Sequence, residues 1–341
     1  MADNTYAYNL MWFGKHGWFN SIYSVNAMAY EPGRYIYYLT LGNNFSWRKL
    51  SLNLDLMLRN DLQHSVTDDL SVMAELAYRP TDRIDPAKPT ILFMFGGGFK
   101  EGSRDSGHEW FKLLCAQGYP VVSIDYRLGL KDYRQAKLDL KFIKALDRSI
   151  ALAVEDLFSA TAFLLENGSR YGVDPHNMVL SGSSAGAISV LQGEYEICNR
   201  SEIAKVLPED FNYAGVMSFA GAIYSHRNPI RFKNEPCPIA LFHGTADMIV
   251  KYKKIAFFNL CFGGSDEISK CLRKQGFKHH IYRYAGHGHE VSIYEGFCFD
   301  KEMEFLQQDV MKGNRRSIDS LIDDPEAPEA PWGKKDFKAL Y

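Results

Sequence analysis

A regular alternation of short apolar runs and longer helical patterns, from residue 90 to residue 286, constrains the fold more than any other feature of the sequence. The short runs are rich in β-branched and aromatic side chains, as is typical of buried strands. Strands that alternate with helices are joined by crossover connections, so they lie parallel in one sheet with helices packed against it. The sequence thus predicts an α/β fold with a mostly parallel central sheet and helices on both faces.

The individual elements of this pattern can be placed along the chain. Strands are expected at residues 89–95, 121–126, 177–181, 213–219, 239–243 and 280–285. Helices are expected at about residues 107–117, 147–167 and 185–195. The helix at 147–167 has apolar residues at roughly helical spacing and ends at an Asn-Gly pair, which is a common stop signal.

The two ends of the chain depart from this alternation. Residues 34–40 and 50–56 are strand-like, and the second run alternates apolar and polar side chains as a half-buried antiparallel strand does. Residues 324–331 are rich in proline and acidic residues and cannot build a core of their own, although Trp332 can pin this stretch to the body. The sequence therefore predicts three parts, which are a β-rich N-terminal extension at 1–73, an α/β domain at 74–312 and a C-terminal tail at 313–341.

Composition narrows the classes of partner. The 39 Lys and Arg residues nearly balance the 41 Asp and Glu residues, so the formal net charge is −2. This balance gives no electrostatic reason to expect nucleic acid or an anionic membrane as a partner. No stretch approaches the roughly 18 apolar residues of a membrane helix, and the N-terminus has no signal-peptide pattern. We expect a soluble protein, either cytoplasmic or exported after loss of a signal peptide, and its oligomeric state is open.

The aromatic and cysteine residues leave two questions for the structure. The 20 Tyr, 22 Phe and 5 Trp residues fit either a large core or an aromatic-lined cleft, and the two are compatible. The six cysteines do not form the dense pattern of a disulfide framework. Cys261 and Cys271 flank a Gly-Gly turn and are the one pair to test for a bridge, although free thiols are the default in a reducing compartment.

The strongest chemical signal is the pentapeptide GSSAG at residues 182–186, a G-x-S-x-G pattern. A predicted strand ends directly before it and a predicted helix begins directly after it, which distinguishes it from an ordinary Ser/Gly-rich loop. The central serine of such a sharp turn has a strained backbone, so its neighbours must be small. Ser184 is therefore the candidate nucleophile, with its hydroxyl at the positive end of the following helix.

A serine hydroxyl needs a base to take its proton and an acid to orient that base, expected in the order Ser, Asp or Glu, His. Asp247 lies just past the C-terminal end of the strand at 239–243, where the catalytic groups of open α/β sheets gather. His289 lies in the sequence GHGHE after the last strand. Ser184, Asp247 and His289 are therefore the predicted catalytic triad.

The histidines of this region have to be distinguished. His287 stands two residues before His289 and is the alternative base, but we favour His289 because it follows both glycines of the turn. His243 is expected to be structural and to hold the loop that carries the acid. No cluster of Cys, His or carboxylate residues has the spacing of a metal site, so neither a metal nor another cofactor is expected.

Three consecutive glycines, Gly96, Gly97 and Gly98, follow the strand at 89–95. Glycines let the backbone approach a ligand closely and point N–H groups at it. A phosphate loop is excluded because no Gly-Lys-Ser/Thr follows. Gly97, Gly98 and Ala185 are the predicted donors of an oxyanion hole, which would hold the negative oxygen of a tetrahedral intermediate.

Taken together, these motifs resemble those of the α/β-hydrolase superfamily, and most of all its bacterial carboxylesterase branch, which includes acetyl, feruloyl and hormone-sensitive-lipase-like esterases. Further supporting strings are GGGF at 96–99, DYRL at 125–128 and GVDP at 172–175. The resemblance covers about residues 74–312. It implies the α/β-hydrolase fold, the same triad and oxyanion donors, and structural roles for Asp125 and Arg127.

One departure from that family concerns the glycine loop. The family's loop usually begins with a histidine that helps to fix its shape, and this sequence has Phe95 at that position. The identity of the individual oxyanion donors therefore depends on what Phe95 does instead.

The motifs and the resemblance together predict a serine carboxylic-ester hydrolase that works through an acyl-enzyme intermediate without a cofactor. The expected substrate is a small-molecule ester, small or aromatic, such as an acetyl or feruloyl ester of a carbohydrate. A serine peptidase or amidase would use the same three residues and is the alternative. A non-catalytic binding module on this fold is a third reading, against which the intact Ser, Asp and His set argues.

Overall fold

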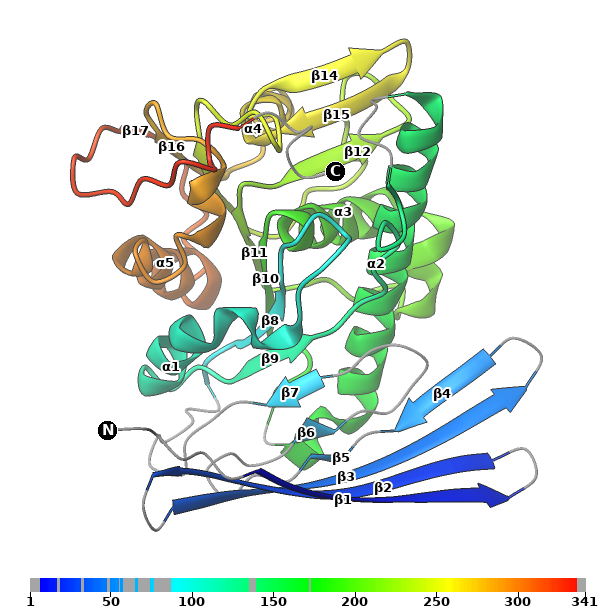
Figure 1. The fold of residues 1–341 in the computed structure, drawn as a ribbon. Coiled ribbons are helices and arrows are strands. Elements are labelled where there is room, and N and C mark those ends of the chain that lie inside the picture. Colours follow the sequence, from blue (N-terminus) through cyan, green and yellow to red (C-terminus); the bar gives the residue numbers. More distant parts are fainter. Residues whose placement is uncertain are drawn as a thin grey trace.

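The computed structural model describes residues 87–134, 139–171 and 173–335, together with the backbone of seven strands between residues 7 and 76. A twisted sheet runs through the centre of the molecule, and helices lie on both of its sides (Figure 1). The predicted α/β fold class is confirmed.

Seven strands of the central sheet run parallel, in the order β17-β16-β13-β11-β10-β8-β9. Their bounds are Thr90–Met94 (β8), Val121–Ile124 (β9), Met178–Ser183 (β10), Gly215–Phe219 (β11), Ile239–Gly244 (β13), His280–Tyr284 (β16) and Ile318–Ile322 (β17). Every residue of β8 to β11 and of β13 is buried, because both faces of the sheet are covered. This double burial explains why the predicted strand runs are almost continuously apolar.

Antiparallel strands from the N-terminal region extend the sheet beyond β9. They are β7 (Ala74–Leu76), β6 (Ser65–Val66) and β5 (Leu56–Met57). A separate antiparallel sheet has the order β1-β2-β3-β4, with bounds Ala7–His16, Phe19–Glu31, Arg34–Trp47 and Leu50–Leu54. The strand predicted at residues 34–40 falls within β3, whereas the run predicted at 50–56 covers β4 and reaches the first residue of β5; β3 and β4 pair antiparallel.

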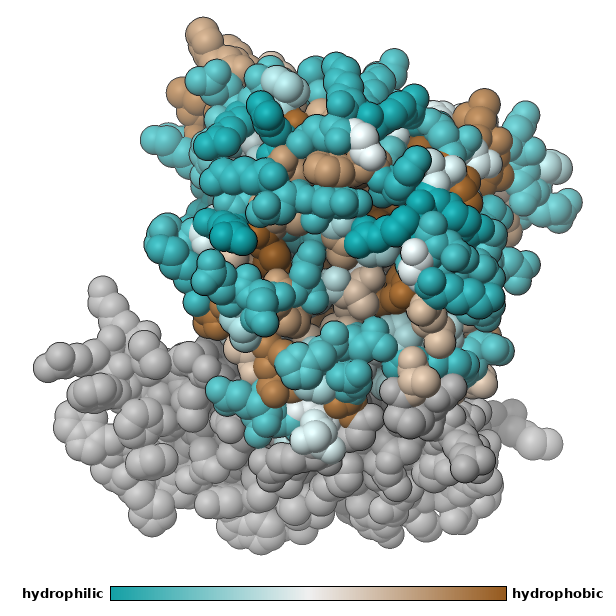
Figure 2. All heavy atoms as spheres, turned by 180° about the vertical axis from the view of Figure 1, so that it is seen from behind, coloured by the Kyte–Doolittle hydropathy of each residue, from teal (hydrophilic) through white to brown (hydrophobic). Residues whose placement is uncertain are grey.

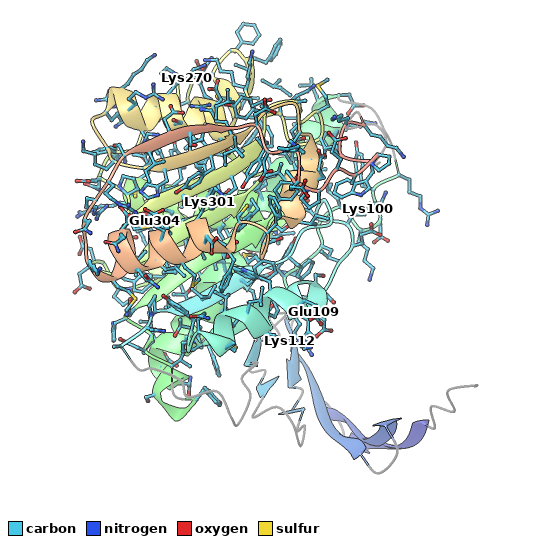
Figure 3. All side chains as sticks on the ribbon, turned by 90° about the vertical axis from the view of Figure 1, so that its left-hand side faces the viewer. Lys100, Glu109, Lys112, Lys270, Lys301 and Glu304 are labelled. Carbon is cyan, nitrogen blue, oxygen red and sulfur yellow. The ribbon has the colours of Figure 1, made fainter. Side chains whose placement is uncertain are left out.

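The α-helices form a layer on each face of the central sheet. They are α1 (His108–Ala116), α2 (Leu140–Asn167), α3 (Ala185–Asn199), α4 (Ser265–Lys274) and α5 (Phe299–Phe305). Helices α1 and α5 lie over one face, whereas α2 and α3 lie against the other (Figures 1 and 3). Figure 3 shows charged side chains on the outer surface of the first layer, namely Glu109 and Lys112 of α1 and Lys301 and Glu304 of α5.

Helix α2 begins earlier than predicted, at Leu140 rather than at residue 147. The side chain of Asp139 accepts hydrogen bonds from the N–H groups of Lys141 and Phe142, at 3.0 and 2.9 Å. An aspartate at this position satisfies backbone donors that have no partner within the helix. The cap therefore sets the start of α2, and the apolar spacing alone did not reveal it.

Helices α4 and α5 were not placed from the sequence, and two further parts of the fold were not predicted either. The first is a small antiparallel sheet with the order β12-β15-β14, with bounds Ala222–Ser225, Leu260–Gly264 and Lys254–Phe257. The second is β17, which lies within the stretch predicted as a tail, so the central sheet continues beyond residue 312. As an edge strand with alternate residues exposed, β17 lacks the continuous apolar character of the central strands.

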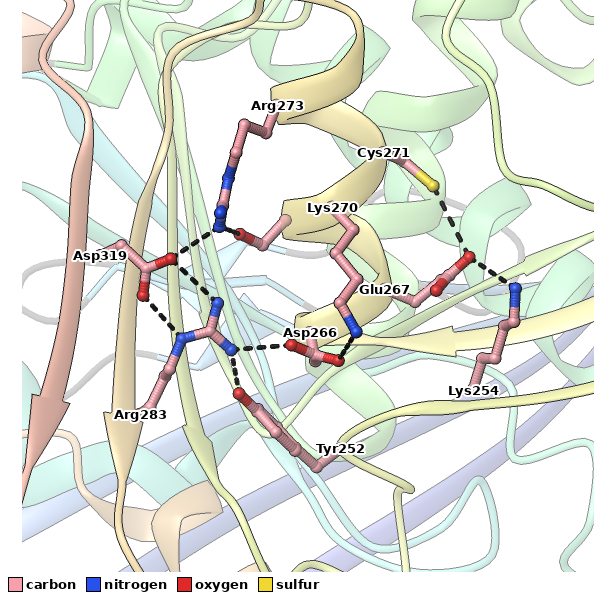
Figure 4. Close-up of polar contacts among 10 residues, drawn as sticks. Tyr252, Lys254, Asp266, Glu267, Lys270, Cys271, Arg273, Arg283 and Asp319 are labelled. Carbon is pink, nitrogen blue, oxygen red and sulfur yellow. Dashed lines mark hydrogen bonds and ion pairs between the residues drawn. The ribbon is translucent and has the colours of Figure 1, made fainter.

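Ion pairs hold β17 at the edge of the sheet (Figure 4). Two nitrogen atoms of Arg283 in β16 contact the carboxylate of Asp319 in β17, at 2.7 and 3.1 Å. Arg273 of α4 reaches the same carboxylate at 2.6 Å, and Arg283 also contacts Asp266 of α4 at 2.9 Å. Because bidentate arginine contacts require a fixed geometry, the network fixes α4, β16 and β17 relative to one another.

The core answers the question raised by the aromatic content. Phe219, Phe242 and Tyr282 stack across neighbouring strands, with ring centroids 4.7 and 4.9 Å apart. Hydrophilic side chains cover most of the described surface on the face seen in Figure 2.

Cys261 and Cys271 are both free and buried, so the candidate bridge is not formed. Among the described helices, none is both long and apolar enough to cross a membrane.

Candidate active site

Ser184 stands on the tight turn between β10 and α3. Its backbone has φ 50° and ψ −113°, a strained conformation for a residue with a side chain. The Ser184 N–H donates to the Phe219 carbonyl at 2.9 Å and holds the turn against β11. A Cβ on Gly186 would lie 2.0 Å from the Met94 carbonyl oxygen, and one on Gly182 would lie 2.5 Å from the Gly186 carbonyl carbon. Close backbone contacts therefore require the glycines on both sides of Ser184.

The three residues predicted as a triad lie in one hydrogen-bonded chain. Ser184 Oγ is 2.7 Å from His289 Nε2, and His289 Nδ1 is 2.7 Å from Asp247 Oδ2. Their relative exposures are 7%, 4% and 3%. Since the ionised Asp247 can only accept, His289 donates from Nδ1 and leaves Nε2 to accept the hydroxyl hydrogen of Ser184. This arrangement can pass the serine proton to His289.

Asp247 follows the C-terminal end of β13 and is held from both sides. Its Oδ1 accepts the N–H groups of Ile249 and Val250, at 2.8 and 3.0 Å. Burial by itself would raise the pKa of Asp247, but the charge of His289 and hydrogen bonds from His243 and His289 outweigh burial and lower this pKa to about 2. The carboxylate of Asp247 is therefore ionised at neutral pH.

His243, in β13, orients the carboxylate of Asp247. Its Nε2 lies 2.9 Å from Val250 O and 3.2 Å from Asp247 Oδ2. Since both neighbours are acceptors, Nε2 carries a hydrogen, and the hydroxyl of Ser265 can donate to Nδ1 across 2.8 Å. The structural role expected of His243 fits these contacts. Ser265 was not recognised from the sequence, because its contact with His243 depends on how α4 packs.

His287, the alternative base, has other partners. Its Nδ1 lies 3.2 Å from Glu290 Oε1 and 3.0 Å from the Tyr294 hydroxyl. Glu290 Oε1 also accepts the Gly288 N–H at 2.8 Å. These contacts shape the turn on which His289 stands, so the geometry favours His289 as the base.

The glycine loop after β8 lies beside the serine. Gly97 has φ 100° and Gly98 has φ 64°, in the region that favours glycine, and a Cβ on Gly97 would lie 1.9 Å from the Glu101 carbonyl oxygen. Both glycines line the same pocket as Ser184. Ala185 begins α3, and the N–H of a first helical residue has no acceptor within its own helix. Of the three predicted oxyanion donors, Gly97 and Gly98 thus line the pocket with the candidate nucleophile, and Ala185 directly follows it in the chain.

Phe95 fixes the glycine loop by packing. Its ring stacks on Tyr126 with centroids 4.5 Å apart and an interplanar angle of 25°. The Tyr126 hydroxyl donates to the Phe95 carbonyl at 2.9 Å. The loop then returns so close to this ring that a Cβ on Gly102 would lie 2.4 Å from it. A stacked ring and a hydroxyl thus take the place of the usual histidine.

Asp125 and Arg127, for which structural roles were expected, lie just after β9 and bind residues of neighbouring segments. The carboxylate of Asp125 accepts from the backbone N–H of Arg104 at 2.7 Å and from its guanidinium at 2.9 Å. Arg127 contacts Asp156 and Glu155 of α2, at 2.8 and 2.7 Å. Both residues join β9 and the loop after it to neighbouring elements.

A pocket of about 720 Å³ opens over Ser184. Its large apolar lining residues are Phe93, Trp110, Ile293 and Trp332. The indole N–H of Trp110 donates to the buried Glu302 at 2.6 Å, and burial raises the pKa of this carboxyl to about 8. Aromatic residues therefore serve both the core and the cleft.

In the part of the chain that is described, no group of three or more His, Cys, Asp or Glu residues could hold a metal ion.

One wall of this pocket comes from the C-terminal segment, which the sequence analysis did not connect with the site. The Trp332 ring meets the His289 ring edge to face, with centroids 6.2 Å apart. The His289 N–H donates to the Gly333 carbonyl at 2.6 Å. The pairing was beyond sequence reasoning, since no spacing rule relates segments so far apart in the chain.

Part of this sequence is similar to one family model and to several curated proteins. A family model described as BD-FAE matches residues 77–223. Lipase 2 of Moraxella sp. (strain TA144) is 35% identical over 107 residues, 31% of this chain and 21% of that protein. Arylacetamide deacetylase-like 4 family member 1 of Mus musculus is 28% identical over 181 residues, 53% of this chain and 39% of that protein. The matched stretches thus span well under half of these curated relatives.

Among solved structures, esterase B from Lactobacillus Rhamnosis (HN001) has a similar fold. The TM-score is 0.50 at 16% sequence identity, and the match covers 71% of this chain and 82% of that chain. At this level of identity the likeness concerns the fold.

Proposed function

We propose that this chain, whose fold and motifs are those of the α/β-hydrolase superfamily, is a carboxylesterase that cleaves esters through an acyl-enzyme on Ser184. The observation that carries the proposal is the chain of two 2.7 Å contacts from Ser184 through His289 to Asp247. The BD-FAE match and the name of the Moraxella relative, a lipase, support ester hydrolysis.

In the first half of the reaction, Ser184 Oγ attacks the ester carbonyl carbon while His289 Nε2 takes the hydroxyl proton. The carbonyl oxygen becomes negative as the new C–O bond forms. The N–H groups of Gly97, Gly98 and Ala185 then stabilise it. Loss of one such donor typically costs about 10²–10³ in rate. His289 returns its proton to the departing alcohol oxygen, and the acyl group remains on Ser184.

In the second half, water replaces the alcohol. His289 takes a proton from this water as its oxygen attacks the acyl carbon, and the same donors stabilise the second oxyanion. Collapse of the intermediate releases the carboxylic acid and restores the Ser184 hydroxyl. Asp247 stays ionised throughout, because its low pKa keeps the proton on His289, and it stabilises the imidazolium.

For the substrate, we propose a small or aromatic ester, and an acetyl or feruloyl ester of a carbohydrate is the specific form. Trp332 lines the pocket and is 37% exposed, which supports an apolar ring in the pocket. The volume of about 720 Å³ is within the usual range for small-molecule sites. An ester panel that varies acyl length and includes acetylated sugars and hydroxycinnamates tests this choice.

The first experiment measures hydrolysis of p-nitrophenyl acetate and of the matched amide, p-nitroacetanilide. The native chain should hydrolyse the ester, and Ser184→Ala should lower kcat/KM by at least about 10⁴-fold. Ser159→Ala, on helix α2, is the control and should retain native activity. Activity that survives in Ser184→Ala contradicts the proposal, and faster cleavage of the amide than of the ester favours the amidase alternative.

A further inference from the structure

The segment 324–335 folds back onto the turn that carries His289. The Tyr294 hydroxyl donates to the Pro328 carbonyl at 2.5 Å, and the His289 N–H donates to the Gly333 carbonyl at 2.6 Å. The rings of Trp332 and His289 meet edge to face, with an interplanar angle of 76°. Three separate contacts therefore join this segment to the turn that positions the candidate base.

The segment is shaped by its own turns before it meets that loop. The N–H of Ala327 donates to Asp324 O, that of Gly333 to Ala330 O, and that of Lys335 to Trp332 O, at 3.1, 2.9 and 3.1 Å. Three prolines between residues 325 and 331 further restrict the backbone. Because the turns and prolines already restrict the backbone of this segment, its contact with the turn of His289 costs little further conformational entropy.

Gly333 fits its place with no room for a side chain. A Cβ there would lie 1.5 Å from Glu290 Oε2 and 2.8 Å from the Glu290 backbone nitrogen. The carboxylate of Glu290 cannot swing aside freely, because its other oxygen binds the Gly288 N–H and lies near His287. The backbone of Gly333 is outside the left-handed region, so this restriction is one of space alone.

The contact with Gly333 acts on the main chain of His289. His289 begins a short 3-10 helix, His289–Ile293, and the first N–H groups of a helix have no acceptor within it. The Gly333 carbonyl satisfies that N–H. Asp247 holds the imidazole from its Nδ1 side, but the position of the ring still depends on a backbone preceded by Gly286 and Gly288.

Trp332 is placed where the alcohol part of an ester must lie. In the proposed reaction His289 Nε2 hands its proton to the departing alcohol oxygen, so the alcohol group lies beside the imidazole. Trp332 contacts that imidazole, lines the pocket and is 37% exposed. Its indole therefore offers a flat apolar surface to the alcohol group rather than to the acyl group.

We propose that Gly333 is a positioning residue for His289 and that Trp332 sets the specificity for the alcohol group, favouring esters of alcohols that carry an aromatic ring. This inference rests on the proposed esterase function. It predicts that a change at Gly333 lowers turnover of every ester alike, whereas a change at Trp332 alters the choice between alcohols.

The test at Trp332 compares benzyl acetate with butyl acetate, which differ in the alcohol, and ethyl benzoate with ethyl butanoate, which differ in the acyl group. Trp332→Ala should lower the benzyl-to-butyl ratio of kcat/KM by about fivefold, because aromatic contacts are worth about 1 kcal/mol beyond burial. Trp332→Phe should restore the ratio to within about threefold, and neither variant should change the acyl ratio. An unchanged benzyl-to-butyl ratio in Trp332→Ala, or an equal change in the acyl ratio, overturns the role of Trp332.

The test at Gly333 uses Gly333→Ala, with Lys335→Ala on the same exposed segment as the control. Gly333→Ala should lower kcat about 10- to 100-fold for all four esters with little change in KM, as expected for a misplaced catalytic group. Hydrogen–deuterium exchange of residues 286–293 should also become faster in this variant and not in the control. Native kcat together with native exchange overturns the positioning role.

The failure of this inference can be told from a failure of the proposed function. If the native chain hydrolyses the esters and Ser184→Ala does not, the esterase function stands whatever the Trp332 and Gly333 variants do. If the native chain hydrolyses none of the esters, the proposed function fails and the specificity role of Trp332 fails with it. The exchange measurement still decides whether Gly333 holds the turn at His289.

Discussion

The turn that carries Ser184 and the turn that carries His289 are built in opposite ways. The first is encoded in five consecutive residues, whose glycines are required by backbone contacts as short as 2.0 Å. The second contains glycines of its own and is held by groups that are distant in the sequence, namely Asp247, Pro328 and Gly333. The position of the nucleophile is thus fixed by its neighbours in the sequence, whereas the position of the base depends on contacts from other segments of the chain.

This difference predicts two kinds of response to mutation. A change inside the serine turn should disturb folding and activity together, because the turn is part of the closely packed β10–α3 junction. A change at the histidine turn should affect turnover with less effect on stability, because several separate segments support this turn and no single contact holds it alone.

The largest effect is expected from Asp247→Asn, which leaves the fold in place and removes the charge that orients His289. The amide can present an N–H to His289 Nδ1 and so favour the wrong tautomer. We expect kcat to fall about 10³–10⁴-fold, measured on p-nitrophenyl acetate at neutral pH. A loss of less than about tenfold would mean that another carboxylate orients the base.

The next test breaks the local turn. Gly186→Ala puts a Cβ 2.0 Å from the Met94 carbonyl oxygen, so the strand-to-helix turn has to open. We expect at least a 10²-fold loss of activity, on the order of the cost of a misplaced catalytic group, with a lower thermal midpoint. Gly193→Ala in the same helix is the matched control, because its Cβ would meet a movable end of the Leu157 side chain, at 2.8 Å. Equal effects of the two substitutions would contradict the special geometry of the turn.

A third test follows stability with pH. The pKa of Asp247 is lowered from 3.8 to about 2 in the folded chain, so ionisation of this group stabilises the fold above pH 4. That stabilisation, about 2 kcal/mol, should be lost as the pH falls from 4 to 2. Urea unfolding across this range should show a steeper loss for the native chain than for Asp247→Asn. Parallel curves would show that the carboxylate contributes nothing to acid stability.

The smallest effect is expected at the glycine loop. Tyr126→Phe keeps the ring that stacks on Phe95 and removes the hydroxyl that donates to its carbonyl. One hydrogen bond contributes about 1 kcal/mol, so activity should fall about fivefold or less. Tyr126→Ala removes the stacked ring as well and should cost clearly more. If the two variants behave alike, packing on Phe95 does not shape the loop.

The same contrast explains how much the sequence could predict. The parallel sheet followed from runs such as residues 89–95, because strands buried on both faces must be almost entirely apolar. The serine turn followed from GSSAG, since the requirement for small residues is local. Strand β17 was missed because an edge strand is exposed at alternate residues and reads as polar.

The candidate site was predictable only as far as its order along the chain. Ser184, Asp247 and His289 follow from motif order and strand ends, but the contacts that hold them do not. Only the packed fold brings together the segments that carry two of these contacts. They are the contact of Ser265 with His243 and that of Gly333 with His289. The role of Phe95 was likewise hidden until its partner, Tyr126, was seen to stack on it.

The central claim is that His289 makes the hydroxyl of Ser184 reactive, and covalent labelling tests it most directly. The chain is treated with a fluorophosphonate, digested, and examined by mass spectrometry, in parallel with His289→Ala and His287→Ala. We expect one adduct on Ser184 in the native chain, clear though slower labelling of Ser184 in His287→Ala, whose turn is disturbed but whose base remains, and almost none in His289→Ala. Labelling at another serine, or equal labelling of Ser184 without His289, would contradict it.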